Sequence, residues 1–504
     1  MKNKTVGNVI IIFGASGDLS QRKLIPAIYS LYKQNLLAKN QLILGVSRTE
    51  YSDQAYQDKM LEALSAESSD DIADIKAFCQ LLKYQSIDTS SAADYKIIKE
   101  RLDSLCAEYK IPHNFLFYLS TPPSLYYIIP KNLAKNGLNK EFDGYKRLVI
   151  EKPFGNDLES AQELNRHLLN YYQESQLYRI DHYLGKETVQ NLLVFRFANL
   201  IFEPLWNANH IENIQISGAE KIGIENRGGY YEKSGVIRDM IQNHLLQLMS
   251  IVAMEPPANM DAYSVRNETL KVLQSVRPFS SDKEVKNNVV VGQYVKGMVD
   301  GEPVNAYRGE KNVTADSMTQ TYAALRLYID NWRWNGVPFY LRTGKRLASR
   351  VSEVVINFKH TPHPFFSRIQ KSEAYKNQLI IRIQPDEGIK LTFAAKEPGS
   401  GFHTREVDMN FFYSEFDAKA IPPAYERLIL DALSGDSTLF SRNDAVETCW
   451  KIIDPVICAI DKDPKAFLQF YESGSWGPEL ADKLLDKLGH KWRNPCNQLR
   501  NKKC

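Results

Sequence analysis

The chain has 504 residues, 43% of them hydrophobic, which is long enough for two hydrophobic cores rather than one. Its 63 basic and 60 acidic residues leave a formal net charge of +3, a mixed balance that argues against a nucleic-acid-binding protein. The amino-terminal apolar run leads straight into a glycine turn, and no stretch of about 18 apolar residues occurs, so the sequence predicts neither export nor a membrane span.

The first third of the chain alternates apolar, strand-like runs with amphipathic helical stretches, which is typical of βαβ units around a mostly parallel sheet. A helix is expected at Leu24–Lys33, and the polar stretch 66–74 is expected at the surface. We therefore predict a Rossmann-like α/β dinucleotide-binding domain over residues 1–181. Its expected strands are Asn8–Phe13, Gln41–Val46, Asn114–Leu119 and Arg147–Ile150.

An apolar strand ends in the glycine turn Gly14-Ala15-Ser16-Gly17-Asp18, ahead of the expected helix. A strand–turn–helix of this kind directs backbone N–H groups and a positive helix N-terminus at the space above the turn, where a pyrophosphate usually binds. The spacing is GxxGD rather than the full GxGxxG, so a simple tight turn is the alternative.

The second strand is followed by Arg48, at the place where proteins that bind a ribose 2′-hydroxyl carry an acid. An acid would repel a 2′-phosphate, whereas a guanidinium can bind it with charge-assisted hydrogen bonds. Arg48 therefore favours NADP over NAD. The alternative is a solvated loop cation.

Lys152 lies in Glu151-Lys152-Pro153, directly after an expected strand. Open α/β sheets bind their ligands at the carboxyl ends of strands, which makes Lys152 a candidate ligand-binding residue. The bond to Pro153 is a candidate cis peptide. Taken alone, the segment is equally consistent with an ordinary turn.

An acid, an imidazole, a phenol and two cations gather in Arg179-Ile180-Asp181-His182-Tyr183-Leu184-Gly185-Lys186. If a helix begins near His182, then His182 and Lys186 are i and i+4 and can converge on one phosphate. The alternative is a solvated helix start with an aspartate cap.

The segment 234–249 has apolar residues at a helical period, interrupted by Asp239, Asn243 and His244. A histidine in an apolar helix is more often a satisfied core residue than a catalyst. A dehydrogenase nevertheless needs a base that removes a hydroxyl proton as hydride leaves the same carbon, and a nearby acid would orient and charge that base.

Beyond about residue 180 the chain has longer β-like segments mixed with helices. This texture predicts a larger α+β domain over residues 182–504, which is built on a predominantly antiparallel sheet and serves substrate binding and oligomerisation. No Pro/Gly/Ser-rich linker separates the two domains, so we expect the active site in a cleft between them. The expected strands include Ile211–Ile216, Val351–Phe358 and Gln378–Gln384.

The six cysteines show no Cys-x-x-Cys pair and no histidine at metal-ligand spacing. We expect neither a zinc site nor a disulfide framework, but reduced thiols in a cytoplasmic protein. The cysteines are Cys79, Cys106, Cys449, Cys458, Cys496 and Cys504.

Several strings occur in one order along nearly the whole chain: GASGDL with RKLIPA, EKPFG, RIDHYLGKE, NRGGYYEKSGVIRDMIQNHLLQ, NGVPFYLRTGK and YESGSWGP. In this order and spacing they resemble the glucose-6-phosphate dehydrogenase family. The resemblance implies hydride transfer from C1 of glucose 6-phosphate to NADP, giving the 6-phospho-lactone, in the oxidative pentose phosphate pathway. It implies no metal, because the hydride and the proton each have their own acceptor.

The resemblance also implies roles for individual residues. His244 would accept the C1 hydroxyl proton, with Asp181 as its dyad partner. His182, Tyr183 and Lys186 would form the phosphate site.

Other residues match the sugar side of the family's site. Lys152 would touch both sugar and coenzyme, and Glu220 and Asp239 would accept hydrogen bonds from sugar hydroxyls. Lys345, Arg350 and Gln384 fall at further substrate-binding positions.

On the coenzyme side, the resemblance places the glycine loop on the dinucleotide, Arg48 at the 2′-phosphate, and Tyr126 and Lys152 nearby. Some members use NAD as well, and some carry a second, structural NADP, of whose site only Arg382 is matched here. Family analogy favours a homodimer or homotetramer, with no nucleic-acid or membrane partner. The loop residues are Gly14, Ala15, Ser16, Gly17, Asp18, Leu19, Ser20 and Gln21.

Two other functions stay open. One is a dehydrogenase of another hexose phosphate or another sugar, although an unphosphorylated sugar would leave His182 and Lys186 without a phosphate. The other is a catalytically silent dinucleotide-binding regulator. That function predicts loss of the base or its partner, whereas Asp181 and His244 are both present.

Overall fold

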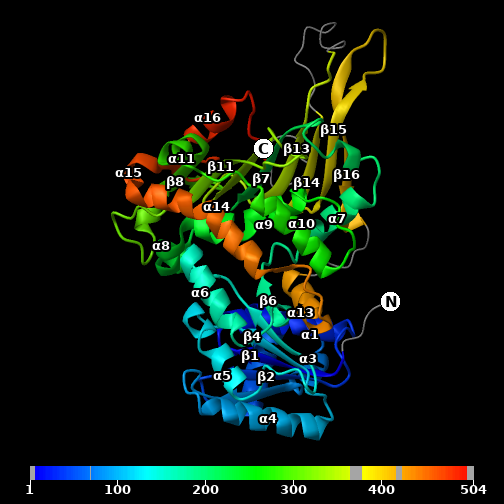
Figure 1. The fold of residues 1–504 in the computed structure, drawn as a ribbon, viewed down its shortest axis with the longest axis vertical. Helices are drawn as coiled ribbons and strands as arrows, with labels where there is room; N and C mark the ends of the chain where they lie inside the picture. Colours follow the sequence, from blue (N-terminus) through cyan, green and yellow to red (C-terminus); the bar gives the residue numbers. More distant parts are fainter. Residues whose placement is uncertain (1–5, 68–69, 364–376, 416–422, 496–504) are drawn as a thin grey trace. The chain divides into compact units, whose positions relative to one another are not determined.

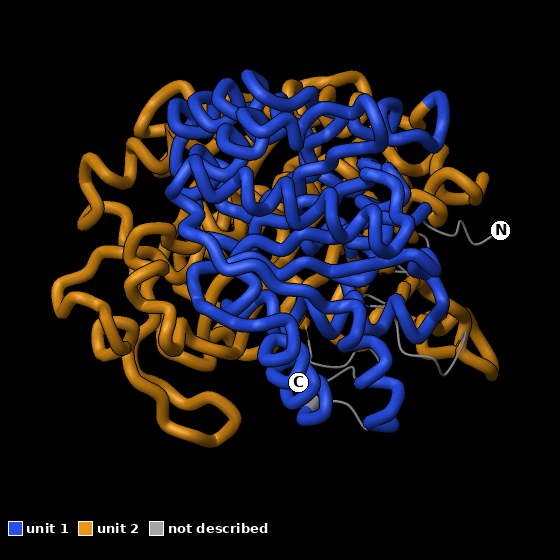
Figure 2. The backbone as a smooth tube through the Cα atoms, turned by 90° about the horizontal axis from the view of Figure 1, so that it is seen from below, with its two compact units in different colours: residues 1–185, 258–266, 422–447 blue, residues 186–257, 267–421, 448–504 orange. Residues whose placement is uncertain are grey.

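The computed structural model describes residues 6–67, 70–363, 377–415 and 423–495. The chain divides into two compact units (Figure 2). Unit 1 comprises residues 1–185, 258–266 and 422–447, and unit 2 comprises residues 186–257, 267–421 and 448–504. The predicted domain boundary after residue 181 stays a prediction.

Unit 1 is built on a seven-stranded sheet (Figure 1). Neighbouring strands are parallel, except that the edge strand β17 pairs with β6 in the antiparallel direction. The chain runs outward from β1 to β2 and β3, then returns to β4, β5 and β6 on the other side of β1, which makes the sheet doubly wound. In sheet order the strands are β17 (Phe440–Ser441), β6 (Leu177–Ile180), β5 (Lys146–Ile150), β4 (Phe115–Leu119), β1 (Asn8–Phe13), β2 (Gln41–Ser47) and β3 (Leu82–Ser86).

The central strands of unit 1 form because they are continuous apolar runs, as strands covered on both faces require. Every residue of β1, β2 and β4 is buried. The connecting helices are amphipathic, and α6 begins with a capping box in which the Asp157 carboxylate accepts the Ser160 N–H at 2.8 Å. The helices are α1 (Ile25–Lys33), α2 (Asp53–Glu67), α3 (Ile72–Cys79), α4 (Asp94–Tyr109), α5 (Ile129–Lys135), α6 (Leu158–Leu169) and α13 (Ala424–Ser434).

Unit 2 is built on a nine-stranded, mostly antiparallel sheet, in which β7 pairs with β12, and β8 with β18, in parallel. In sheet order its strands are β16 (Thr404–Phe412), β15 (Gly388–Lys396), β14 (Gln378–Gln384), β13 (Val351–Phe358), β7 (Ile211–Ala219), β12 (Pro338–Gly344), β11 (Tyr322–Tyr328), β8 (Val289–Val295) and β18 (Leu468–Glu472). A small hairpin pairs β9 (Gly297–Val299) with β10 (Glu302–Val304).

The helices of unit 2 include a wide π-helix, η6 (Ile237–Leu245), between two α-helices. Two further helices, α10 (Ala262–Gln274) and α14 (Asn443–Lys462), run along the chain from one unit into the other. The α-helices within unit 2 are α7 (Glu187–Phe197), α8 (Gly228–Val236), α9 (Leu246–Ala253), α11 (Asp282–Asn288), α15 (Pro464–Phe467) and α16 (Leu480–Asp486).

The predicted fold class is confirmed, and β1, β13 and β14 have the predicted bounds. The predicted helix at Leu24–Lys33 starts one residue later, at Ile25, because Ser20–Leu24 form a short π-helix before it. Cys79, Cys106, Cys449 and Cys458 form no disulfide within the described chain, whereas Cys496 and Cys504 lie outside the described residues. Among the described helices, none has the length and apolar character needed to cross a bilayer.

Candidate functional site

The candidate site of unit 1 lies along one edge of its parallel sheet. Because β1, β2, β4, β5 and β6 all run in the same direction, the residues that follow them emerge at the same edge. We call this the carboxyl edge of unit 1. The residues that follow the five strands are Gly14, Arg48, Ser120, Glu151 and Asp181.

The glycine turn is held against two neighbouring strands. Gly14 has a φ of +82°, and a Cβ atom there would lie 2.1 Å from the carbonyl oxygen of Ser120. The Gly14 N–H donates to Val46 O at 2.8 Å, and the Gly17 N–H donates to Gly14 O at 2.9 Å. Helical structure begins at Asp18, so the loop presents main-chain N–H groups and a helix N-terminus at this edge, as a pyrophosphate site requires.

The remaining loop residues divide between anchors and exposed positions. Ala15 and Ser20 are buried, and the Gln21 side chain donates to Ser16 O at 2.9 Å. Asp18 is exposed and forms an ion pair with Arg22. Because both side chains are exposed to solvent, this ion pair contributes little to the stability of the protein. Leu19 is half-buried. The loop therefore holds its shape through its main chain and its small side chains.

Arg48 is exposed at the end of β2, next to a serine that belongs to the glycine loop's own network. The Ser47 hydroxyl donates to Ser16 Oγ at 3.0 Å. The Arg48 side chain makes no hydrogen bond or ion pair with the described part of the chain, so its guanidinium is available to an anion.

Lys152 is half-buried, and its peptide bond to Pro153 is cis, as predicted. The preceding Glu151 carboxylate accepts a hydrogen bond from the Tyr118 hydroxyl at 2.6 Å. Burial raises the pKa of this carboxyl, although hydrogen bonds from Tyr118 and Tyr425 oppose the shift. Tyr126 is buried at the end of a short 3₁₀ helix, Pro123–Tyr126.

Asp181 is 2% exposed and organises the turn that follows β6. Its Oδ1 accepts the Tyr183 N–H at 2.8 Å, and its carbonyl accepts the Leu184 N–H at 3.1 Å. This aspartate turn occupies the residues at which a helix was expected, so the prediction of a helix starting near His182 is wrong: α7 starts at Glu187. His182 and Lys186 therefore do not share a helical face.

The candidate site of unit 2 also lies along one sheet edge. Strands β7, β12 and β14 end at the same edge, since β12 pairs with β7 in parallel and β14 is reached from β7 through the antiparallel β13. The residues after β7 and β12 are Glu220 and Lys345, β14 ends on Gln384, and Arg350 precedes β13. Four predicted substrate residues, which come from three separate parts of the sequence, are thus gathered at the carboxyl edge of unit 2.

Glu220 and Lys345 form an ion pair at this edge. Lys345 is 7% exposed, and its Nζ lies 5.7 Å from the centroid of the Tyr231 ring. Burial, together with the negative charges of Asp239 and Glu220, holds the pKa of Tyr231 well above its usual value. The pair offers one acceptor and one donor group to a polyhydroxylated ligand.

Lys186 joins the same edge from the start of α7, where it is the residue before the first helical position. Its Nζ donates to Gln384 Oε1 at 2.5 Å, and Gln384 Nε2 donates to Ser352 Oγ at 3.1 Å. Arg350 is exposed. Lys186 therefore adds positive charge at the end of β14, on the same edge of the sheet.

Asp239 and His244 lie on the wide helix η6, which packs on the sheet near this edge. A Cβ built on Gly218 of β7 would lie 3.5 Å from Leu245 and 3.6 Å from Met240. His244 is fully buried, and Asp239 is 5% exposed. The Tyr230 hydroxyl lies 3.4 Å from Asp239 Oδ1. Both predicted polar residues are thus carried on the helix that covers the ends of β7 and β12.

Ser352 and Tyr231 were not predicted from the sequence. Tyr231 could have been proposed from the sequence, because it stands in the same family motif as Asp239, eight residues before it. Ser352 has no local signal, because only the strand register brings it opposite Gln384. Arg382, the matched position of a second NADP site, is fully buried and pairs with Glu353 at 2.9 Å.

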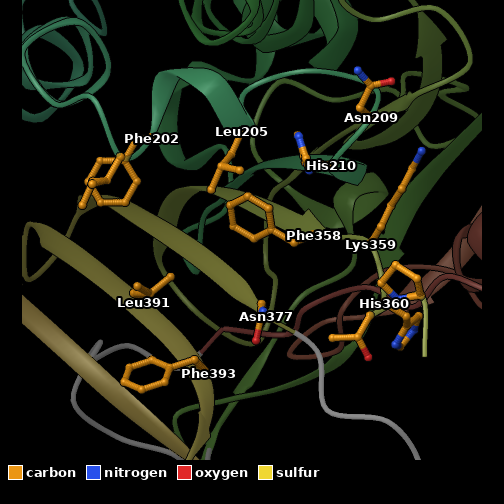
Figure 3. A pocket seen from close by; sticks show the side chains of 13 residues that line it. Phe202, Leu205, Asn209, His210, Phe358, Lys359, His360, Asn377, Leu391 and Phe393 are labelled. Atoms are coloured by element: carbon orange, nitrogen blue, oxygen red, sulfur yellow. The ribbon is translucent and has the colours of Figure 1, made fainter. Parts of the chain in front are cut away.

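A separate pocket of about 560 Å³ lies at the other end of β13, away from Arg350 (Figure 3). Figure 3 shows apolar side chains on one side of it and His210, Lys359 and His360 on the other. It contains none of the predicted site residues. Its lining is Ile201, Phe202, Leu205, Asn209, His210, Phe358, Lys359, His360, Thr361, Pro362, Asn377, Leu391 and Phe393.

Two family models match the chain: "Glucose-6-phosphate dehydrogenase, NAD binding domain" over residues 11–191 and "Glucose-6-phosphate dehydrogenase, C-terminal domain" over residues 193–493. The chain is 53% identical to the glucose-6-phosphate 1-dehydrogenase of Aggregatibacter actinomycetemcomitans, over 98% of both chains. It is 47% identical to that of Treponema pallidum, over 98% of this chain and 96% of the relative. A solved structure of a glucose-6-phosphate dehydrogenase in complex with its substrate, glucose-6-phosphate, matches with a TM-score of 0.90 at 35% identity, covering 98% of this chain and 100% of the other.

Proposed function

Because this chain belongs to the glucose-6-phosphate dehydrogenase family, we propose that it oxidises C1 of glucose 6-phosphate and reduces NADP. The observation that carries the proposal is the full-length similarity to a glucose-6-phosphate 1-dehydrogenase, at 53% identity over 98% of both chains. The chemistry of the two carboxyl edges agrees with it, since one presents a dinucleotide-binding loop and the other a polar, cationic set of side chains.

In the proposed reaction His244 is the general base. Its imidazole takes the proton of the C1 hydroxyl as the C1–H bond breaks, so that the C1–O bond becomes the carbonyl of the 6-phospho-lactone. Asp181 orients the imidazole and stabilises its protonated form. When bound, NADP supplies the hydride acceptor, C4 of its nicotinamide ring.

The substrate-binding residues divide by the chemistry they offer. His182, Tyr183 and Lys186 bind the phosphate through charge-assisted hydrogen bonds. Glu220 and Asp239 accept hydrogen bonds from sugar hydroxyls. The remaining proposed substrate-binding residues are Lys152, Lys345, Arg350 and Gln384.

The proposed coenzyme site uses the glycine loop for the pyrophosphate, with Tyr126 and Lys152 nearby. Arg48 binds the 2′-phosphate, which makes NADP the preferred coenzyme. The support is the exposure of Arg48 at the end of β2 and its lack of an ion-pair partner among the described residues.

Initial rates test the proposal directly. Absorbance of the reduced nicotinamide is followed with glucose 6-phosphate and with unphosphorylated glucose, each supplied with NADP and with NAD. We expect turnover with the phosphorylated sugar and a higher kcat/KM with NADP. No turnover with any of the four pairs would refute the enzyme function and favour a binding regulator.

A further inference from the structure

The string YESGSWGP, residues 471–478, supplies none of the proposed site residues, yet it is bonded to the segment that carries Lys345. Its first residue, Tyr471, lies on the edge strand β18, and its hydroxyl donates to the Lys345 carbonyl oxygen at 2.7 Å. The Gly474 N–H donates to Arg346 O at 2.7 Å. Two hydrogen bonds therefore fasten this string to the segment after β12, at the carboxyl edge of unit 2.

The segment after β12 contains a residue in an unfavourable backbone conformation. Arg346 has a φ of +52°, in the left-handed region that residues other than glycine rarely occupy. Such a conformation persists where the surrounding structure fixes it, and it is found most often at functional sites. Here the Arg346 N–H donates to Ile222 O at 3.2 Å, and the Arg346 carbonyl accepts the Gly474 N–H. Contacts with distant segments therefore hold the main chain next to Lys345.

The main chain of Lys345 is fixed at both of its polar groups. Its N–H donates to Thr321 O at 2.9 Å, and its carbonyl accepts the Tyr471 hydroxyl. A tyrosine hydroxyl has one proton to donate. The Lys345 carbonyl lies nearer to it than Thr321 O, which is 3.3 Å away, so the proton points at Lys345. The Thr321 hydroxyl, 3.0 Å from the Tyr471 oxygen, is then the donor of that second pair.

This arrangement leaves the Tyr471 hydroxyl no capacity for a substrate. Its proton goes to Lys345, and its oxygen accepts the proton of Thr321. Tyr471 is 3% exposed, and burial holds the pKa of its hydroxyl well above its usual value, so the group stays a donor at neutral pH. Any influence of Tyr471 on the substrate must therefore pass through Lys345.

The ion pair between Lys345 and Glu220 depends on where the Lys345 main chain lies. The Glu220 N–H donates to Gly344 O at 3.0 Å, and the Glu220 carbonyl accepts the Leu347 N–H at 2.9 Å, so the carboxylate is tied to the same segment. A lysine ammonium on a flexible four-carbon stem loses entropy when it is held at one point. A fixed main chain reduces the number of positions that this ammonium can take.

We propose that Tyr471 is a positioning residue, which holds the main chain of Lys345 so that its ammonium lies beside Glu220, where the sugar of the substrate binds. This inference rests on the proposed function, because it takes Lys345 and Glu220 to be sugar ligands. Tyr471 acts on the affinity for the sugar phosphate and not on the coenzyme, since the proposed coenzyme residues all belong to unit 1.

The test compares Tyr471→Phe with the native protein, with Kd for glucose 6-phosphate measured by calorimetry, and KM and kcat by initial rates. Phenylalanine keeps the ring beside Tyr294 and Tyr322 and removes only the hydroxyl, so the fold is retained. We expect Kd and KM for glucose 6-phosphate to rise by about fivefold, the effect of losing one buried hydrogen bond. Both kcat and the KM for NADP are expected to change by less than about twofold.

A double-mutant cycle shows whether Tyr471 acts through Lys345. In a Lys345→Ala background the ammonium is already gone, so Tyr471→Phe is expected to raise Kd by less than about twofold. An undiminished effect in that background would overturn the proposal, because Tyr471 would then act on the substrate directly or through another residue.

Tyr95→Phe is the matched control. Tyr95 is fully buried in unit 1, and its hydroxyl donates to Thr89 O at 2.8 Å, so the variant removes the same kind of hydrogen bond. Both variants are expected to lower Tm by a similar amount, but only Tyr471→Phe should raise the KM for glucose 6-phosphate. Equal changes of KM in the two variants would overturn the proposal, because a general loosening of the fold would explain them.

The measurements also separate this inference from the proposed function. Turnover of glucose 6-phosphate by the native protein, with unchanged Kd and KM in Tyr471→Phe, would overturn the inference alone. Failure of the native protein to bind glucose 6-phosphate would overturn both, because Lys345 would then have no sugar to hold.

Discussion

The carboxyl edges of the two units both bring polar groups to one place, but they do so with different parts of the chain. In unit 1 the central feature is main chain: the glycine loop bends tightly enough that Gly14 leaves no room for a side chain beside Ser120. In unit 2 the features are side chains, the Glu220–Lys345 pair and the Lys186–Gln384 pair. A backbone site tolerates few changes of shape, whereas a side-chain site can be altered one group at a time.

The two sites also differ in how far apart their residues lie in the sequence. The glycine loop is a contiguous segment directly after one strand. Lys186 and Gln384 are 198 residues apart, and Glu220 and Lys345 are 125 apart. Unit 1 therefore encodes its proposed anion site in one local motif, while unit 2 depends on strand register to assemble its proposed site.

The largest expected effect is on His244, the residue of unit 2 proposed to do the chemistry. His244→Ala is expected to lower turnover by about 10²–10⁴-fold, the usual contribution of a general base, while leaving glucose 6-phosphate binding nearly intact. Stopped-flow or initial-rate measurements of kcat, together with calorimetry for binding, check this. His210→Ala, at the pocket beyond the far end of β13, is the control. Near-normal kcat in His244→Ala would remove His244 from this role.

The fold class and the local motifs could be predicted from the sequence, because single strands, helices and turns each have a signal in a short stretch of chain. The apolar runs of β1 and β13 identified those strands with their bounds. The short strands β3 and β6, with sequences LKYQS and LYRI, were not predicted, because segments of only four or five residues are too short to show a clear period. The wide turn geometry of η6 has no local signature either, since its apolar spacing resembles that of an ordinary helix.

The expected helix start at His182 failed for a physical reason. The Asp181 carboxylate could cap a helix or close a turn, and it accepts the Tyr183 N–H in a turn. Sequence alone does not decide between these outcomes, because the same side chain and nearby N–H groups serve both. The side-chain pairs of unit 2 were beyond prediction for a different reason, namely that the register of four strands is needed to bring them together.

Gly14→Ala tests whether the unit 1 site depends on main-chain shape. A Cβ atom 2.1 Å from Ser120 O, on a backbone with φ of +82°, must displace the loop. We expect the free energy of unfolding to fall by about 2 kcal/mol or more, and the KM values for NADP and NAD to rise together by about thirtyfold. Chemical denaturation and initial rates measure the two effects.

Gly137→Ala is the matched control for that change. Gly137 also has a positive φ, +77°, but a Cβ there would meet no atom within 4 Å. It should cost about 1 kcal/mol of stability from backbone strain alone and leave both KM values unchanged. If Gly14→Ala behaved like Gly137→Ala, the close approach of the loop to Ser120 would be unimportant for coenzyme binding.

Arg48→Ala is expected to give the smallest effect. It tests a side chain of the unit 1 site, whose glycine loop acts through its main chain. Loss of a charge-assisted contact to the 2′-phosphate is expected to raise the KM for NADP by about tenfold and to leave the KM for NAD nearly unchanged. Lys83→Ala removes the same charge from β3, three positions back from the carboxyl edge, and should move neither value. Equal effects of Arg48→Ala on both coenzymes would mean that Arg48 does not read the 2′-phosphate, and coenzyme choice would then rest on the main-chain loop as well.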